Sequence, residues 1–125
     1  MQNQNLKPEN DLKHRAYRYS IEMIKFLDTL SKDTSTEIIT KQLLRSSTSI
    51  GANIIEAKGS SSKRDFTNFF GYSLKSANET LYWLGLLRDA KEIKNEKLDY
   101  LLKETKELAN ILGSSILTLK GRKQF

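Results

Sequence analysis

Apolar side chains recur at steps of three or four residues along most of this chain, which is the spacing of one face of an α-helix. Four such stripes lie within residues 12–30, 39–57, 66–88 and 98–119, the last passing through Leu102. They predict four helices, separated by breaks near residues 31–33, 59–62 and 92–95. Short connections make consecutive helices antiparallel neighbours, so the sequence predicts an all-α, up-down-up-down four-helix bundle.

Residues typical of helix ends mark the same boundaries. Thr34 and Glu37 have the spacing of a capping box at the start of the second helix. Ser62 and Asn95 are candidate N-caps of the third and fourth helices. Gly59 is predicted to end the second helix in the left-handed backbone conformation, where glycine carries no steric penalty.

The length of 125 residues suits one compact domain and is too short for two ordinary ones. We therefore expect a single domain over residues 1–125, with flexible ends at about 1–8 and 121–125. No stretch approaches the roughly 18 to 20 apolar residues that a membrane-spanning helix needs. The sequence thus predicts neither membrane insertion nor secretion, and a cytoplasmic location fits it.

Cysteine is absent and His14 is the single histidine. Disulfide frameworks, thiolate zinc sites and the two-histidine di-iron sites of helical bundles are therefore excluded. Hydrolysis by a Ser-His-Asp triad would have to use His14, which lies among basic residues. We expect no metal, no cofactor and no enzymatic activity.

Lysine and arginine exceed aspartate and glutamate by 21 to 15, which gives a net charge of +6 and favours polyanionic partners. Two basic concentrations lie near the chain ends, and antiparallel packing would bring them to the same end of the bundle. We interpret them as a candidate basic rim for nucleic-acid phosphates, with ordinary solubilising charge as the alternative. The rim consists of Lys13, Arg15, Arg18, Lys120, Arg122 and Lys123.

The second predicted helix contains an unusual run of small and polar residues between Arg45 and Asn53. Such residues are poor helix formers, and small side chains let two helices approach closely, so tight packing is favoured over a phosphate site. On the flanks of the second and third helices we predict a structural polar network rather than general acids or metal ligands. Its members are Arg45, Asn53, Glu56, Asp65 and Glu79.

The third predicted helix carries a second apolar stripe, about 125° from the first, so that apolar residues cover most of its circumference. Together with an outward residue of the second helix, this stripe predicts burial against another subunit and hence a homo-oligomer. Stacking of these aromatic rings on unpaired bases is the alternative. The candidate interface comprises Ile55, Phe69, Tyr72, Trp83 and Leu86.

Residues 41–93 resemble the small four-helix-bundle proteins encoded within intervening sequences of bacterial large-subunit (23S) ribosomal RNA genes. The motifs that carry the resemblance are 42–53 (QLLRSSTSIGAN), Glu56-Ala57, Gly59, Asp65-Phe66, 76–79 (SANE) and 82–84 (YWL). The less diagnostic first and last helices extend the resemblance over about residues 10–119. This family is related to the accessory protein of diversity-generating retroelements, which binds nucleic acid and a reverse transcriptase.

The resemblance implies a bacterial bundle that assembles into a ring-like pentamer, and it supplies no catalytic residues to carry over. We therefore expect a non-catalytic, oligomeric accessory protein that binds RNA or DNA through its basic surfaces. The alternative is a protein-interaction scaffold whose basic charge is incidental. A reverse transcriptase partner does not follow from the residues of this chain.

Overall fold

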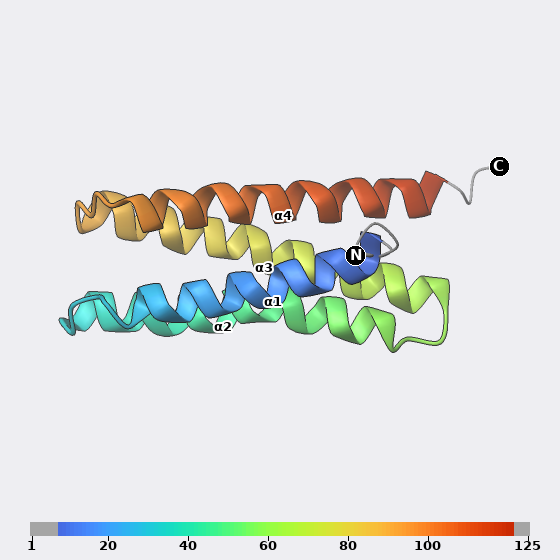
Figure 1. Ribbon diagram of the computed structural model, residues 1–125, viewed down its shortest axis with the longest axis horizontal. Coiled ribbons are helices and arrows are strands. Elements are labelled where there is room, and N and C mark those ends of the chain that lie inside the picture. Colours follow the sequence, from blue (N-terminus) through green and yellow to red (C-terminus); the bar gives the residue numbers. More distant parts are fainter. Residues whose placement is uncertain (1–7, 122–125) are drawn as a thin grey trace, which may run out of the picture.

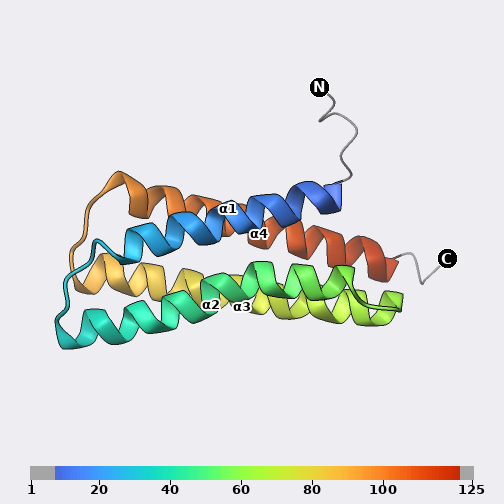
Figure 2. The ribbon, with the colours of Figure 1, turned by 60° about the horizontal axis from the view of Figure 1, so that its bottom comes forward.

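A computed structural model describes residues 8–121, which fold into four antiparallel helices (Figures 1 and 2). These are α1 (Pro8–Leu27), α2 (Thr34–Lys58), α3 (Lys63–Ala90) and α4 (Glu96–Gly121). The predicted all-α four-helix bundle is thus confirmed. The predicted flexible ends lie outside the described residues, except for Pro8 and Gly121, which are the first and last helical residues.

The apolar stripes of the sequence form one core between the four helices. Nineteen apolar side chains of this core are less than a tenth exposed. They include all the apolar residues of the stripe predicted for α2. Two details differ from the prediction. Arg88, the last position of the α3 stripe, is exposed, and Leu87 is buried in its place. In α4, Leu101 is fully buried whereas Leu102 is partly exposed.

Hydroxyl groups inside the apolar core form hydrogen bonds between α2 and α3, whereas the buried hydroxyls of Thr36 and Ser47 have no partner among the described residues. Ser46 of α2 and Thr80 of α3 are bonded at 2.8 Å, and Ser73 donates to the carbonyl oxygen of Ile50 at 2.8 Å. These contacts join α2 to α3 through side chains that are all buried. The small polar residues of α2 therefore serve helix packing, as their size predicts.

Helix α1 approaches α2 most closely where two small residues meet. A Cβ atom added at Gly51 would lie 3.4 Å from the Cβ atom of Ala16, so the two helices leave room there for hardly more than a methyl group. Gly51 and Ala16 together therefore set the spacing between α1 and α2.

Two of the predicted helix caps differ in the structure. Asp33, one residue before Thr34, is the N-cap of α2, and its carboxylate accepts a hydrogen bond from the Thr36 amide at 3.0 Å. Gly59 does end α2, but its φ of −87° is right-handed. The left-handed residue is instead Glu92, with φ of 53°, after the end of α3.

The remaining two predicted caps are confirmed. The Ser62 hydroxyl accepts from the Asp65 amide at 3.0 Å, and the Asn95 side chain accepts from the Leu98 amide at 2.7 Å. Helix α1 ends at Leu27, earlier than predicted, because a single turn over residues 28–30 replaces its last helical turn.

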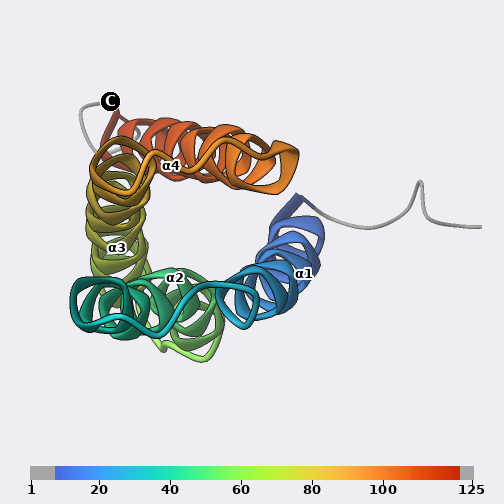
Figure 3. The same ribbon diagram turned by 90° about the vertical axis from the view of Figure 1, so that its left-hand side faces the viewer.

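The four helices surround the core in chain order, so that α1 and α4 are also neighbours (Figure 3). The α2–α3 interface is the most extensive of the four and the α1–α4 interface is the least. The α1–α4 interface is closed partly by polar contacts, including a buried hydrogen bond of 2.6 Å between Tyr19 and Thr105. Among residues 8–121, no helix combines the length and the apolar character needed to cross a membrane.

Candidate nucleic-acid interface

Basic residues gather at the end of the bundle where α2 turns into α3 and where α4 ends (Figure 1). Lys58 is the last residue of α2, Lys63 and Arg64 open α3 after the 59–62 connection, and Lys120 lies in the last turn of α4. We call these four residues the cationic end. Asp65, in the first turn of α3, is a carboxylate of the same end.

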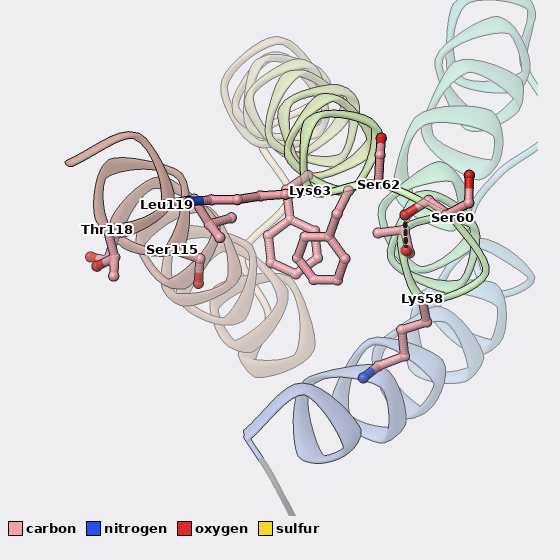
Figure 4. A pocket seen from close by; sticks show the side chains of 12 residues that line it. Lys58, Ser60, Ser62, Lys63, Ser115, Thr118 and Leu119 are labelled. Carbon is pink, nitrogen blue, oxygen red and sulfur yellow. Dashed lines mark hydrogen bonds between the residues drawn. The ribbon is translucent and has the colours of Figure 1, made fainter. Parts of the chain in front are cut away.

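The cationic end contains a cavity of about 890 Å³ between α2, α3 and α4. Phe66 and Phe70 of α3 line it, with ring centroids 4.7 Å apart. Hydroxyl groups from the 60–62 connection and from α4 also line it, and the Ser60 hydroxyl donates to the Ala57 carbonyl oxygen at 2.6 Å. The amine of Lys58 extends toward α1 and that of Lys63 toward α4, so the two charges lie on different sides of the cavity (Figure 4).

The basic residues of the cationic end differ from those at the opposite end in their partners. Within residues 12–121, none of the four forms an ion pair. At the opposite end, Lys91 lies 3.1 Å from Asp33 and Arg88 lies 2.8 Å from Asp89. Lys32 and Lys94 of the opposite end form no ion pair within residues 12–121 either, so the cationic end differs in that all four of its basic residues are unpaired.

The predicted basic rim is spread over several surfaces. Lys13 lies in a groove between α1 and α2, and Arg18 lies beside Glu22 and Tyr100 on the α1–α4 surface. Lys120 belongs to the cationic end. The other two predicted members at the C-terminus, Arg122 and Lys123, lie outside the described residues.

Arg15, also predicted for the rim, is a structural residue of the α1–α4 interface. Its guanidinium donates to both carboxylate oxygens of Glu104, at 2.6 and 2.8 Å, and to Glu107 at 2.6 Å. The Glu104 side chain is only 12% exposed. These hydrogen bonds, chiefly that to Glu104, raise the pKa of Arg15 above its ordinary value. Arg15 is therefore neutralised within the bundle and offers little charge to a phosphate.

Part of the predicted polar network forms. Arg45 of α2 pairs with Glu79 of α3, which also accepts a hydrogen bond of 3.0 Å from the Trp83 indole nitrogen. The bond from Trp83, followed by the pairing with Arg45, lowers the pKa of Glu79. Both charged side chains are more than a third exposed, so the pair orients α2 against α3 more than it stabilises them.

The other three members do not join this network. Asn53 donates to the Ser49 carbonyl oxygen of its own helix at 2.9 Å. Glu56 and Asp65 are exposed, and their side chains take no part in the hydrogen bonds or ion pairs found over residues 12–121.

The predicted subunit interface divides between two faces. Phe69 and Trp83 are partly buried and pack against the core of their own bundle, whereas Tyr72 and Leu86 are exposed on α3. Ile55 is exposed in the groove between α1 and α2, on a different side. The five residues therefore do not form one continuous surface.

Sequence reasoning identified only Ile55 of an apolar surface on α1 and α2 and missed the rest. Six large apolar side chains are exposed on these two helices, one of which is Ile38 near the start of α2. We call the other five the outer apolar face; they are Tyr17, Ile21, Ile24, Leu44 and Ile55. On α1 they recur at steps of four and three residues, a signal that the stronger core stripe conceals. Sequence reasoning also missed Lys58, Lys63 and Arg64, although all three flank the serine connection.

The fold and its cationic end define a helical bundle with a polar-rimmed cavity. Among the side chains of residues 12–121, no group of three or more acidic or histidine residues is arranged to hold a metal. The chain belongs to the 23S rRNA-intervening sequence protein family, whose model matches residues 9–114. This finding confirms the resemblance deduced from the motifs of α2 and α3. No curated protein matches the sequence.

A solved structure supports the same assignment. The chain is similar to a protein of unknown function from the S23 ribosomal protein family of Bacteroides thetaiotaomicron, with 35% sequence identity and a TM-score of 0.79. The similarity covers 86% of this chain and 96% of that one.

Proposed function

We propose that this protein binds nucleic acid without catalysing a reaction, and that the cationic end supplies its main contacts to phosphates. The observation that carries the proposal is the grouping of Lys58, Lys63, Arg64 and Lys120 at one end of the bundle, where none of the four forms an ion pair within residues 12–121. Phosphate backbones attract such a cluster regardless of sequence, and every contact releases counterions. An accessory role in an RNA- or DNA-containing complex fits this kind of binding.

The test is a fluorescence anisotropy titration against a structured RNA and a matched DNA duplex at several salt concentrations. Glutamine at all four positions of the cationic end should lower the slope of log affinity against log salt on duplex DNA by up to about 3.6, or about 0.9 per lost phosphate contact. The matched control has the same net charge as this variant, because it replaces four exposed lysines elsewhere by glutamine; these are Lys41, Lys75, Lys103 and Lys106. An equal effect of both variants, or no binding at low salt, would refute the proposal.

We further propose that the chain forms homo-oligomers through the outer apolar face, with the five subunits that the family resemblance implies. Tyr17 is 68% exposed and Ile55 is 49% exposed, and both line a groove of about 430 Å³ between α1 and α2. Apolar side chains grouped in this way favour burial against another protein surface.

Light scattering measures the assembly directly. Ile55→Asp should reduce the mass in solution to that of one chain while circular dichroism remains helical. The control is Leu117→Asp, because Leu117 is 73% exposed on α4, away from this face. A monomeric starting protein at micromolar concentration would contradict oligomerisation. If the protein assembles but binds neither RNA nor DNA, the scaffold function becomes the better account.

A further inference from the structure

The cavity at the cationic end combines chemical features that nonspecific phosphate binding does not require. Its volume of about 890 Å³ lies within the range of small-molecule sites, roughly 300–1,000 Å³. It is lined by the ring of Phe66, which is partly exposed, and by the buried ring of Phe70. A cluster that only attracts a phosphate backbone needs neither the hollow nor the aromatic wall.

Charge and hydroxyl groups surround this aromatic wall. Lys58 and Lys63 line the cavity from the end of α2 and the start of α3, and their amines extend in different directions (Figure 4). Neither amine is ion-paired within residues 12–121. Ser115 and Thr118 add hydroxyl groups from α4. A ligand that complements the whole cavity is therefore flat and apolar in the middle, polar at its edge, and negatively charged on two sides.

A nucleotide within a single strand has this combination of properties. Its base offers a flat face to an aromatic ring and polar groups at its edge, and the chain continues from it through a phosphate on either side. A base in a duplex is stacked between its neighbours and cannot enter a cavity without being unpaired. The shape and charge of the cavity therefore select an unpaired nucleotide.

We propose that the cavity receives one unstacked base of a nucleic-acid strand, which stacks on Phe66 while Lys58 and Lys63 bind the phosphates on either side. The inference rests on the proposed function and makes it more specific, since it predicts a preference for unpaired strands. Loops, bulges and ends of RNA, or single-stranded DNA, are the substrates of this site.

The experiment uses oligonucleotides of one sequence that carry a central 2-aminopurine, whose emission falls when it stacks on an aromatic ring. Each is prepared as RNA and as DNA, single-stranded and annealed to its complement, and is titrated with the full chain. Single strands should bind more tightly than duplexes, and the environment of the 2-aminopurine should change on binding. Comparison of the RNA and DNA strands identifies which of the two the site prefers.

Phe66→Leu is the decisive variant, because it keeps an apolar side chain and removes the ring. It should weaken single-strand binding about tenfold and abolish the emission change, but leave duplex affinity and the salt slope unaltered. The matched control is Tyr82→Leu, which removes an exposed ring of α3 that does not line the cavity. Ser115→Leu fills the cavity from α4 without altering Phe66 and should weaken single-strand binding to the same extent. It therefore tests the cavity even if Phe66→Leu fails to fold.

The two proposals fail in different ways. If single strands and duplexes bind equally and both cavity variants bind as the wild type does, base capture is overturned while phosphate binding at the cationic end stands. If no oligonucleotide binds even at low salt, both proposals are overturned.

Discussion

Replacing Arg15 by methionine separates its structural role from the role in nucleic-acid binding that its charge suggests. Methionine preserves much of the apolar stem and removes the three hydrogen bonds to Glu104 and Glu107. An exposed ion pair contributes about 0.2–1 kcal/mol, whereas breaking a buried one costs about 3–5 kcal/mol. With Arg15 26% and Glu104 12% exposed, this pair lies between those limits, so we expect a loss of about 2 kcal/mol.

Urea denaturation followed by circular dichroism measures this loss. For a slope of about 2 kcal/mol per molar urea, the midpoint should fall by about 1 M. Glu104→Gln introduced into the Arg15→Met protein should recover part of the stability, because it removes the carboxylate left without its partner. The salt slope of nucleic-acid binding should stay unchanged in Arg15→Met and fall by about 0.9 on duplex DNA in Lys63→Gln.

The opposite pattern would refute this reasoning. It would consist of an unchanged urea midpoint in Arg15→Met together with a salt slope lowered as much as in Lys63→Gln. Arg15 would then contact phosphate in solution, and the ion pairs between α1 and α4 would contribute nothing to folding.

Four further substitutions test the packing and the helix ends. Thr105→Val should cost about 2 kcal/mol in urea denaturation, because it leaves the buried Tyr19 hydroxyl without its partner. Tyr19→Phe should cost only about 1 kcal/mol, because the Thr105 hydroxyl still donates to the Leu101 carbonyl oxygen. Gly113→Ala should raise the melting temperature, since no atom lies within 4 Å of the added Cβ and alanine favours helix by up to about 1 kcal/mol. In the folded protein, the hydrogen bond from the Thr36 amide lowers the pKa of Asp33. The Asp33 carboxylate therefore contributes its full stabilisation above about pH 4, and this stabilisation is lost as the pH falls through the lowered pKa. Urea midpoints measured from about pH 4 downward should therefore fall less steeply in Asp33→Asn than in the wild type.

The sequence predicted the helices because their apolar period is a local property. Where two adjacent residues fit the same core or cap position, the sequence could not show which of them occupies it. Leu101 and Leu102 lie three and four residues after Leu98, and both steps keep a side chain near the same face. In the folded bundle Leu101 is the one that is buried. Asp33 and Thr34 are likewise adjacent cap-forming residues, and the position of the first helical turn selects Asp33.

The candidate site was harder to predict because its residues meet only in the folded chain. Arg15 counts as one more positive charge in the sequence, and its glutamate partners lie 89 and 92 residues away. Lys58 and Lys63, by contrast, flank a short connection and could have been grouped from the sequence. A tight connection brings the end of one helix beside the start of the next, so the two lysines lie at the same end of the bundle.

The unequal packing of the four interfaces has a consequence for the order of folding. Helices α2 and α3 are joined by the short 59–62 connection and share the most extensive interface, so their association closes only a small loop. The side-chain contacts between α1 and α4 join residues 75 to 92 positions apart and are the costliest in chain entropy. We therefore expect the α2–α3 hairpin to form first and the α1–α4 contacts to form last. In unfolding, α1 should detach first, and hydrogen exchange should then be faster for its amide protons than for those in the middle of α2 and α3.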